Sequence, residues 1–275
     1  MRSRGCAATA PRALLSLAVL AAPLFAAGCG GEDPDRAEVR SYLERVNAVQ
    51  SSQKAVLVRA DTVLRGYAER KPIGAPALAG VADGVRGVRA EVAAVKPPPA
   101  AREVHERLLK IYDIDAGLVA ETERMVTYQD AAPAALAPLD RASAKLRRDL
   151  DRAKTAPSQA RALKRFGASL TRVGKRLRAL KAPALLQPAH AAQIKRLAST
   201  RKLSAQLETA VRKKDSRRVA KLLLHFRKNT TSKRAERRLT QRGIDLHTER
   251  LRELTAAQTE LGRAQARLNR TFRPS

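Results

Sequence analysis

The sequence predicts an all-α protein, an elongated antiparallel helical bundle or bundles with a long C-terminal helix. Aromatic residues make up 3% of the chain, tryptophan is absent, and the apolar residues are mostly alanine, leucine and valine. Such a composition favours packed helices over a sheet. No segment alternates apolar and polar residues over a convincing length, whereas apolar residues recur at helical spacing. The chain is long enough for one large or two small domains.

Two stretches carry the clearest helical signal, an apolar stripe spaced 3-4-3-4-3. This spacing places the stripe on one helix face, with the geometry of bundles and coiled coils. A helix with one apolar face needs antiparallel neighbours to cover it. The first stripe comprises Leu78, Val81, Val85, Val88, Val92 and Val95, and the second comprises Leu163, Phe166, Leu170, Val173, Leu177 and Leu180.

The two stripes belong to an ungapped internal repeat with a period of 85 residues. Residues 72–130 and 157–215 share fifteen identities over 59 positions. Five of the fifteen matched pairs are Pro72 with Pro157, Lys96 with Lys181, Pro98 with Pro183, His105 with His190, and Asp130 with Asp215. The repeat therefore predicts that the two halves of the chain use similar helices.

Proline and aspartate mark the helix ends. Proline ends the preceding helix and is tolerated at the start of the next, so helices end at the matched Pro72/Pro157 and Pro98/Pro183 positions. Asp130 and Asp215 are placed as N-caps. A break in the last helix is expected near 229–232 or at Gly243. The expected helices are 35–71, 75–96, 100–128, 132–155, 158–181, 188–213 and 216–271.

The N-terminal end reads as an export signal. Three arginines precede an apolar run over 13–27, which is too short to span a bilayer. The run Leu24-Phe25-Ala26-Ala27-Gly28-Cys29 resembles the lipobox of bacterial lipoproteins, although Ala26 stands where that family usually has leucine. The resemblance implies cleavage after Gly28 and acylation of Cys29. The alternative is an ordinary signal peptide, which leaves Cys29 a free thiol.

Four segments follow from these features: a signal peptide (1–28), a lipidated tether (29–34), a nearly neutral helical region (35–156) and a strongly basic one (157–275). Fully extended, the tether reaches about 17 Å. Residues 29–156 hold 21 Lys/Arg and 19 Asp/Glu, a net charge of +2. Residues 157–275 hold 31 Lys/Arg and 7 Asp/Glu, a net charge of +24. This asymmetry is evidence about partners rather than about fold.

The densest basic run is the one candidate binding site. Cations lie on several sides of a helix whose buried side is marked by Val219, Leu222, Leu223 and Phe226, and such a helix binds polyanions in a salt-dependent way. A solvated helix face is the simpler alternative. The candidate residues are Arg212, Lys213, Lys214, Arg217, Arg218, Lys221, Arg227, Lys228, Lys233, Arg234, Arg237 and Arg238.

The sequence offers no catalytic signature. It contains no phosphate-binding glycine loop, no G-x-S-x-G, no H-E-x-x-H and no C-x-x-C. His105 and His190 are equivalent in the repeat, but a metal site needs more ligands than two histidines, so we expect a structural role for both near their helix starts. We therefore expect neither an enzyme, nor a cofactor, nor a metal site.

These observations lead to a membrane-anchored lipoprotein on the outer face of the bacterial cell membrane, with a non-catalytic binding or structural role. Its basic half is expected to contact anionic lipid or a cell-wall polymer. Export and the lack of interleaved aromatic residues argue against nucleic acid. The alternatives are an adaptor that recruits a partner helix through Leu254, Leu261 and Leu268, and a carrier of a small ligand. The repeat and charge pattern loosely resembles uncharacterised helical lipoproteins of high-GC bacteria, which implies no function.

Overall fold

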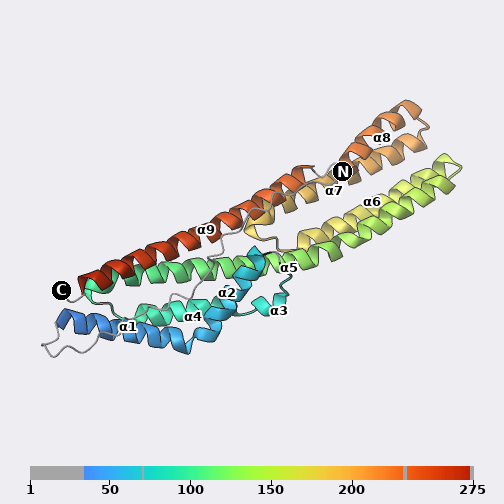
Figure 1. Ribbon diagram of the computed structural model, residues 1–275. Coiled ribbons are helices and arrows are strands. Elements are labelled where there is room, and N and C mark those ends of the chain that lie inside the picture. The colour runs from blue at the N-terminus through green and yellow to red at the C-terminus, as the bar shows by residue number, and fades with distance from the viewer. Residues whose placement is uncertain (1–33, 70, 232–233, 273–275) are drawn as a thin grey trace. The chain divides into compact units, whose positions relative to one another are not determined.

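The computed structural model describes residues 34–69, 71–231 and 234–272, and every regular element in that part of the chain is a helix (Figure 1). The predicted all-α fold is confirmed. Cys29 and Lys233 lie outside the described residues. The elements are α1 (Pro34–Ser52), α2 (Lys54–Ala68), α3 (Ala75–Leu78), α4 (Val81–Ala94), the short 3₁₀ helix η1 (Pro99–Ala101), α5 (Arg102–Arg152), α6 (Ala156–Ala179), the 3₁₀ helix η2 (Ala184–Leu186), α7 (Gln187–Arg212), α8 (Ser216–Thr231) and α9 (Arg234–Thr271).

The chain forms two compact units, which we call unit 1 and unit 2. Unit 1 comprises Met1–Glu123 and His247–Ser275, and unit 2 comprises Arg124–Leu246. The long helices α5 and α9 each contribute residues to both units. The units therefore do not follow the expected division at 156/157, because the basic helices after that point pack on the second part of α5.

Unit 1 encloses one apolar core made by α1, α2, α4, the first part of α5 and the second part of α9. The stripe residues that lie in α4, Val81, Val85, Val88 and Val92, are buried in it, as expected from their spacing. Leu254, Leu261 and Leu268 of α9 are buried in the same core. The narrow stripe at the end of the chain thus finds its partner helices within unit 1, and it is not exposed to recruit another protein.

Unit 2 packs the second part of α5, α6, α7, α8 and the start of α9. The stripe of α6 is its centre: Phe166, Leu170, Val173 and Leu177 are at most 4% exposed. Helix α6 begins at a capping box, in which the side chains of Thr155 and Ser158 each satisfy a free amide of the other residue.

Several predicted helix ends are confirmed. The helices that carry the two stripes end at Ala94 and Ala179, with Val95 and Leu180 as C-caps, and each is followed by a proline that precedes a 3₁₀ turn. These prolines are Pro98 and Pro183. Proline suits the start of a new helix because its φ is fixed and it has no backbone N–H that would need a partner. The C-caps, the 3₁₀ turns and the starts of α5 and α7 are each 85 residues apart.

Other predicted ends are wrong. Asp130 is not an N-cap, because α5 continues through it and through Pro133 and Pro138. The helix expected over 35–71 is divided at Gln53, which caps α2 without a side-chain hydrogen bond. The expected break near 229–232 is present, since α8 ends at Thr231, but Gly243 lies within α9. There a side chain would collide with the backbone oxygen of Leu185, so glycine allows close packing on η2.

Candidate anion-binding surface

Helix α8 is held in place by a tight turn after α7. Lys214 adopts a left-handed conformation (φ 56°), which reverses the chain. Asp215 then opens α8, because its Oδ1 accepts a hydrogen bond from the backbone N–H of Arg218 at 2.9 Å. The predicted N-cap role of Asp215 is confirmed.

The inner side of α8 packs on the core of unit 2. Val219, Leu222 and Phe226 contact that core, and the ring of Phe226 meets the edge of Phe166 with centroids 6.0 Å apart. One turn further on, the Asn229 amide donates to Thr200 Oγ1 of α7 at 2.7 Å. These contacts fix which side of α8 faces solvent.

The outer face of α8 combines cations with exposed leucine. Arg217, Lys221, Leu224 and Lys228 recur at helical spacing opposite the packed side, and all four are exposed. Leu224 is 69% exposed, the largest value among the large apolar side chains that the structure describes as exposed. Leu223, which was expected to be buried, is 39% exposed. The side of α8 that packs on the core is narrower than the arc over which its apolar residues are spread. We call Arg217, Lys221, Leu224 and Lys228 the α8 face.

The α8 face lacks acidic neighbours. Among the described residues, no carboxylate lies within ion-pair distance of Arg217, Lys221 or Lys228. Exposed cations without carboxylate partners repel one another and are free to meet an anion. This arrangement can bind anionic groups but contains no nucleophile or general base with a partner.

The other predicted cations spread over three elements. Arg212 ends α7 and pairs with Glu208 of the preceding turn at 2.9 Å. Arg237 borders a hollow of about 1010 Å³ in unit 2, which also includes the Tyr128–His190 pair and apolar side chains. The remaining predicted cations in the described residues are exposed: Lys213 and Lys214 in the turn, Arg218 and Arg227 on α8, and Arg234 and Arg238 on α9.

The positive charge is concentrated in unit 2. Unit 2, Arg124–Leu246, holds 32 Lys/Arg and 8 Asp/Glu, a net charge of +24. The rest of the chain holds 23 Lys/Arg and 18 Asp/Glu, a net charge of +5. The predicted asymmetry is therefore a property of one compact unit, to which the second part of α5 also contributes.

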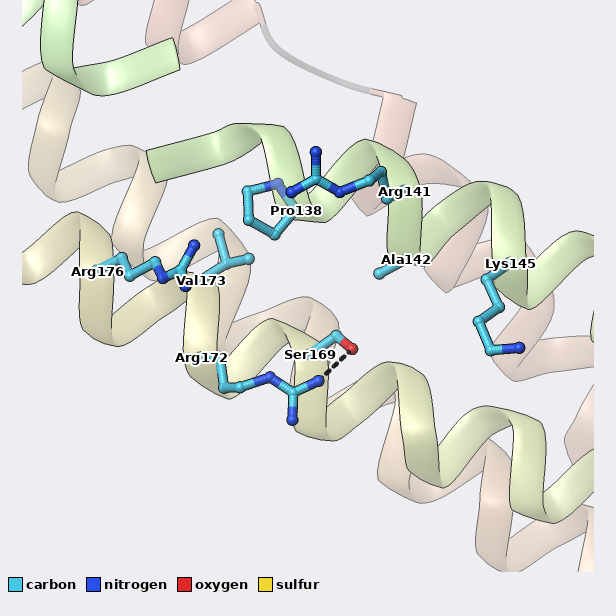
Figure 2. A pocket seen from close by; sticks show the side chains of 8 residues that line it. All are labelled: Pro138, Arg141, Ala142, Lys145, Ser169, Arg172, Val173 and Arg176. Atoms are coloured by element: carbon cyan, nitrogen blue, oxygen red, sulfur yellow. Dashed lines mark hydrogen bonds between the residues drawn. The ribbon is translucent and has the colours of Figure 1, made fainter. Parts of the chain in front are cut away.

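A second basic site lies between α5 and α6 and was missed by sequence reasoning. Figure 2 shows Arg141 and Lys145 of α5 opposite Arg172 and Arg176 of α6. They border a hollow of about 300 Å³ whose other lining residues are Pro138, Ala142, Ser169 and Val173. We call these eight residues the α5–α6 trough. The only sequence signal was two pairs of cations spaced four apart on different helices.

The two matched histidines each contact a tyrosine ring and hydroxyl. In unit 1, the Tyr42 hydroxyl lies 3.0 Å from His105 Nδ1, and in unit 2 the Tyr128 hydroxyl lies 2.9 Å from His190 Nδ1. Burial lowers the pKa of both imidazoles, which favours the neutral ring. The expected structural role fits these contacts, and each histidine belongs to a different unit.

No family model, curated protein or solved structure matches this chain. Within the described residues, no three histidine, cysteine, aspartate or glutamate side chains gather as they would around a metal ion. No helix over the same ranges combines the length and apolar character needed to cross a membrane. The function must therefore be argued from the surface itself.

Proposed function

We propose that this protein is a lipid-anchored component of the bacterial cell envelope that has no catalytic role and binds an anionic membrane through unit 2. The observation that carries the proposal is the α8 face, where an exposed leucine is surrounded by cations that lack carboxylate partners. The lipid anchor itself is inferred from the sequence that ends at Cys29.

The lipid anchor and the cations would have different tasks. The resemblance implies a diacylglycerol on Cys29, whose two acyl chains suffice for stable attachment, so the cations would hold unit 2 against the anionic leaflet. Each lysine or arginine close to an anionic leaflet contributes about 1 kcal/mol. Arg217, Lys221 and Lys228 would therefore supply about 3 kcal/mol at low salt.

Leu224 distinguishes a membrane from a wall polymer. Both are polyanions and both would attract the same cations. A bilayer also offers an apolar phase, and full burial of a leucine side chain is worth about 1.5–3 kcal/mol. A soluble anionic polymer offers no such phase. The exposed leucine in the middle of the cationic face thus favours anionic lipid.

The adaptor hypothesis receives no support from the stripe on which it rested. Leu254, Leu261 and Leu268 are at most 7% exposed and pack inside unit 1. A partner helix would have to displace part of that core before it reached them. The α8 face offers cations rather than a continuous apolar groove.

Removing the charges of the α8 face should weaken vesicle binding about 100-fold. The test uses the chain without residues 1–28 and with Cys29→Ser, so that no lipid contributes. Three changes to glutamine, at Arg217, Lys221 and Lys228, remove about 3 kcal/mol of attraction to phosphatidylglycerol vesicles at low salt. Co-sedimentation measures the affinity, and 1 M salt should abolish it because the screening length falls to about 3 Å.

Two variants serve as comparisons. Changing Lys164, Lys175 and Lys202 to glutamine removes the same charge from exposed positions of α6 and α7 and should weaken binding far less. Leu224→Gln should weaken binding to vesicles while leaving binding to a soluble anionic polymer unchanged. Equal losses in both triple variants, or binding that survives 1 M salt, would contradict a specific membrane-binding face.

Cys29→Ser in the full-length protein should release it to the soluble fraction or leave it as an uncleaved precursor. The reason is that the lipid is attached through the sulfur of the lipobox cysteine. No other cysteine remains after cleavage behind Gly28. Membrane fractionation and mass spectrometry of the N-terminal peptide provide the measurement. A mature wild-type protein with an unmodified Cys29 would refute the anchor.

A further inference from the structure

We propose that the α5–α6 trough is a discrete binding site for a phosphate group, separate from the α8 face. Four cations line it from two helices, Arg141 and Lys145 from α5 and Arg172 and Arg176 from α6 (Figure 2). The ligand class is a phosphate ester, either a lipid headgroup or a soluble phosphate compound. The inference does not depend on the proposed membrane role of α8.

The trough has the charge of an anion site. No carboxylate lines it, and in the described part of the chain none of its three arginines has an ion-pair partner. Of the four cations, only Lys145 has an ion-pair partner: its Nζ lies 3.4 Å from Oδ1 of Asp149, one turn away. Four positive charges along one hollow, with a single acidic neighbour, produce a positive local potential that attracts anions.

The trough also has donors suited to phosphate. Guanidinium groups present several N–H donors in a planar fork, which matches the oxygens of a phosphate better than an ammonium group does. Arg172 Nη2 already donates to Ser169 Oγ at 3.1 Å, so this guanidinium is directed along the trough (Figure 2). The serine hydroxyl itself donates to the backbone carbonyl of Arg165 at 3.2 Å, which holds it in place beside the guanidinium.

Small side chains leave room for a ligand in the α5–α6 trough. Ala142 and Ser169 face the trough, and Val173 beneath them is fully buried. The hollow of about 300 Å³ exceeds the room that a single water needs, which is about 30 Å³. It can therefore admit a phosphate group together with part of the molecule that carries it.

Packing alone does not require these cations. The pairs Arg141/Lys145 and Arg172/Arg176 each place like charges four residues apart, which destabilises a helix slightly. In the ungapped 85-residue comparison, Gly87 and Glu91 of α4 stand where α6 has Arg172 and Arg176. Helix α4 nevertheless buries its apolar stripe as α6 does. The cations of α6 are thus additional to what the stripe needs.

Calorimetric titration of the full mature chain in neutral detergent tests the site. The probes are pyrophosphate, a soluble phosphate compound, and glycerophosphoglycerol, the headgroup of phosphatidylglycerol without its acyl chains. At low salt we expect one ligand to bind per chain. Arg141→Gln, Arg172→Gln and Arg176→Gln together should weaken binding at least tenfold, because they remove three of the four charges that line the trough.

Two further variants separate a site from diffuse charge. Ser169→Leu fills the trough without altering the charge, and it should also weaken binding at least tenfold. Lys164, Lys175 and Lys202 changed to glutamine should weaken it less than threefold. Thermal melts confirm that each variant folds. Changing the cations of the α8 face should leave phosphate binding intact, so that this inference and the proposed function fail independently.

The outcomes are distinct. Tighter binding of glycerophosphoglycerol identifies a lipid headgroup as the source, and tighter binding of pyrophosphate identifies a soluble phosphate compound. Either result supports the site. Many anions bound per chain, equal losses in the trough variant and the lysine control, or undiminished binding by Ser169→Leu would overturn it.

Discussion

Replacing Val88 by aspartate is expected to destabilise unit 1 by about 5 kcal/mol, a large part of the total stability of a typical domain. Val88 lies in the middle of α4 and its side chain is fully buried. The substitution removes apolar contacts and places a carboxylate where no cation or hydrogen-bond donor awaits it. Val173→Asp should have an effect of similar size in unit 2, since Val173 is equally buried in α6.

Thermal or urea unfolding followed by circular dichroism measures the change. Ala90→Asp is a matched control on α4, because Ala90 is exposed and the new charge remains hydrated. The control should melt within a few degrees of the wild type, whereas Val88→Asp should melt far lower or fail to fold. Unchanged melting of both valine variants would show that the stripes do not form the two cores.

Much of this fold could be predicted because its signals are local. An apolar stripe spaced three and four residues apart needs only one helix to be recognised. Pro98, Pro183 and Asp215 mark helix ends through the geometry of their own backbone or side chain, so these ends were predicted correctly. Each of these residues acts on its immediate neighbours in the chain.

The errors concern tertiary contacts. Asp130 resembles Asp215 in sequence, yet no helix begins there, because α5 continues past it. Two prolines inside α5 each remove a backbone hydrogen bond. Leu136 and Leu139 are half-buried and pack on the core of unit 2, so each contributes part of the about 1.5–3 kcal/mol that full burial of a leucine provides. That packing accounts for the single continuous helix α5, where local propensity predicts two helices.

The candidate binding surfaces also differ in how far the sequence predicts them. A dense run of cations is visible along the chain, so α8 was identified, but its exposed side depends on how Phe226 and Asn229 dock. The α5–α6 trough could not be found in this way. Its four cations fall in two ordinary pairs about thirty residues apart in the sequence, and they form a site only when the two helices pack in one register.

The second large effect is expected at Asp115, a carboxylate buried in unit 1. Its side chain is 9% exposed, and its Oδ1 has no hydrogen-bond partner. Burial, with the nearby negative charge of Asp61 as a second cause, raises the pKa of Asp115 to about 7. Asp61 itself pairs with Arg65, so that arginine compensates Asp61 rather than Asp115.

The raised pKa makes stability depend on pH. The folded state holds the Asp115 proton more tightly than the unfolded state, whose aspartate pKa is about 3.9. The contribution of Asp115 is therefore present below that value and is lost as the pH rises from about 4 to about 7. A shift of about three pKa units corresponds to a loss of about 4 kcal/mol at neutral pH.

Asp115→Asn should remove this loss, because the amide has the same shape and never ionises. At pH 8 the variant should be more stable than the wild type by up to about 4 kcal/mol, and at pH 4 the two should be nearly equal.

His247 has the opposite tendency, since burial lowers its pKa to about 4 and stability is lost as the pH falls below 6.5. Its contribution is common to both proteins and cancels in the difference. Urea unfolding at pH 4, 6 and 8 gives that difference directly, and a value independent of pH would show that the pKa of Asp115 is the same in the folded and unfolded protein.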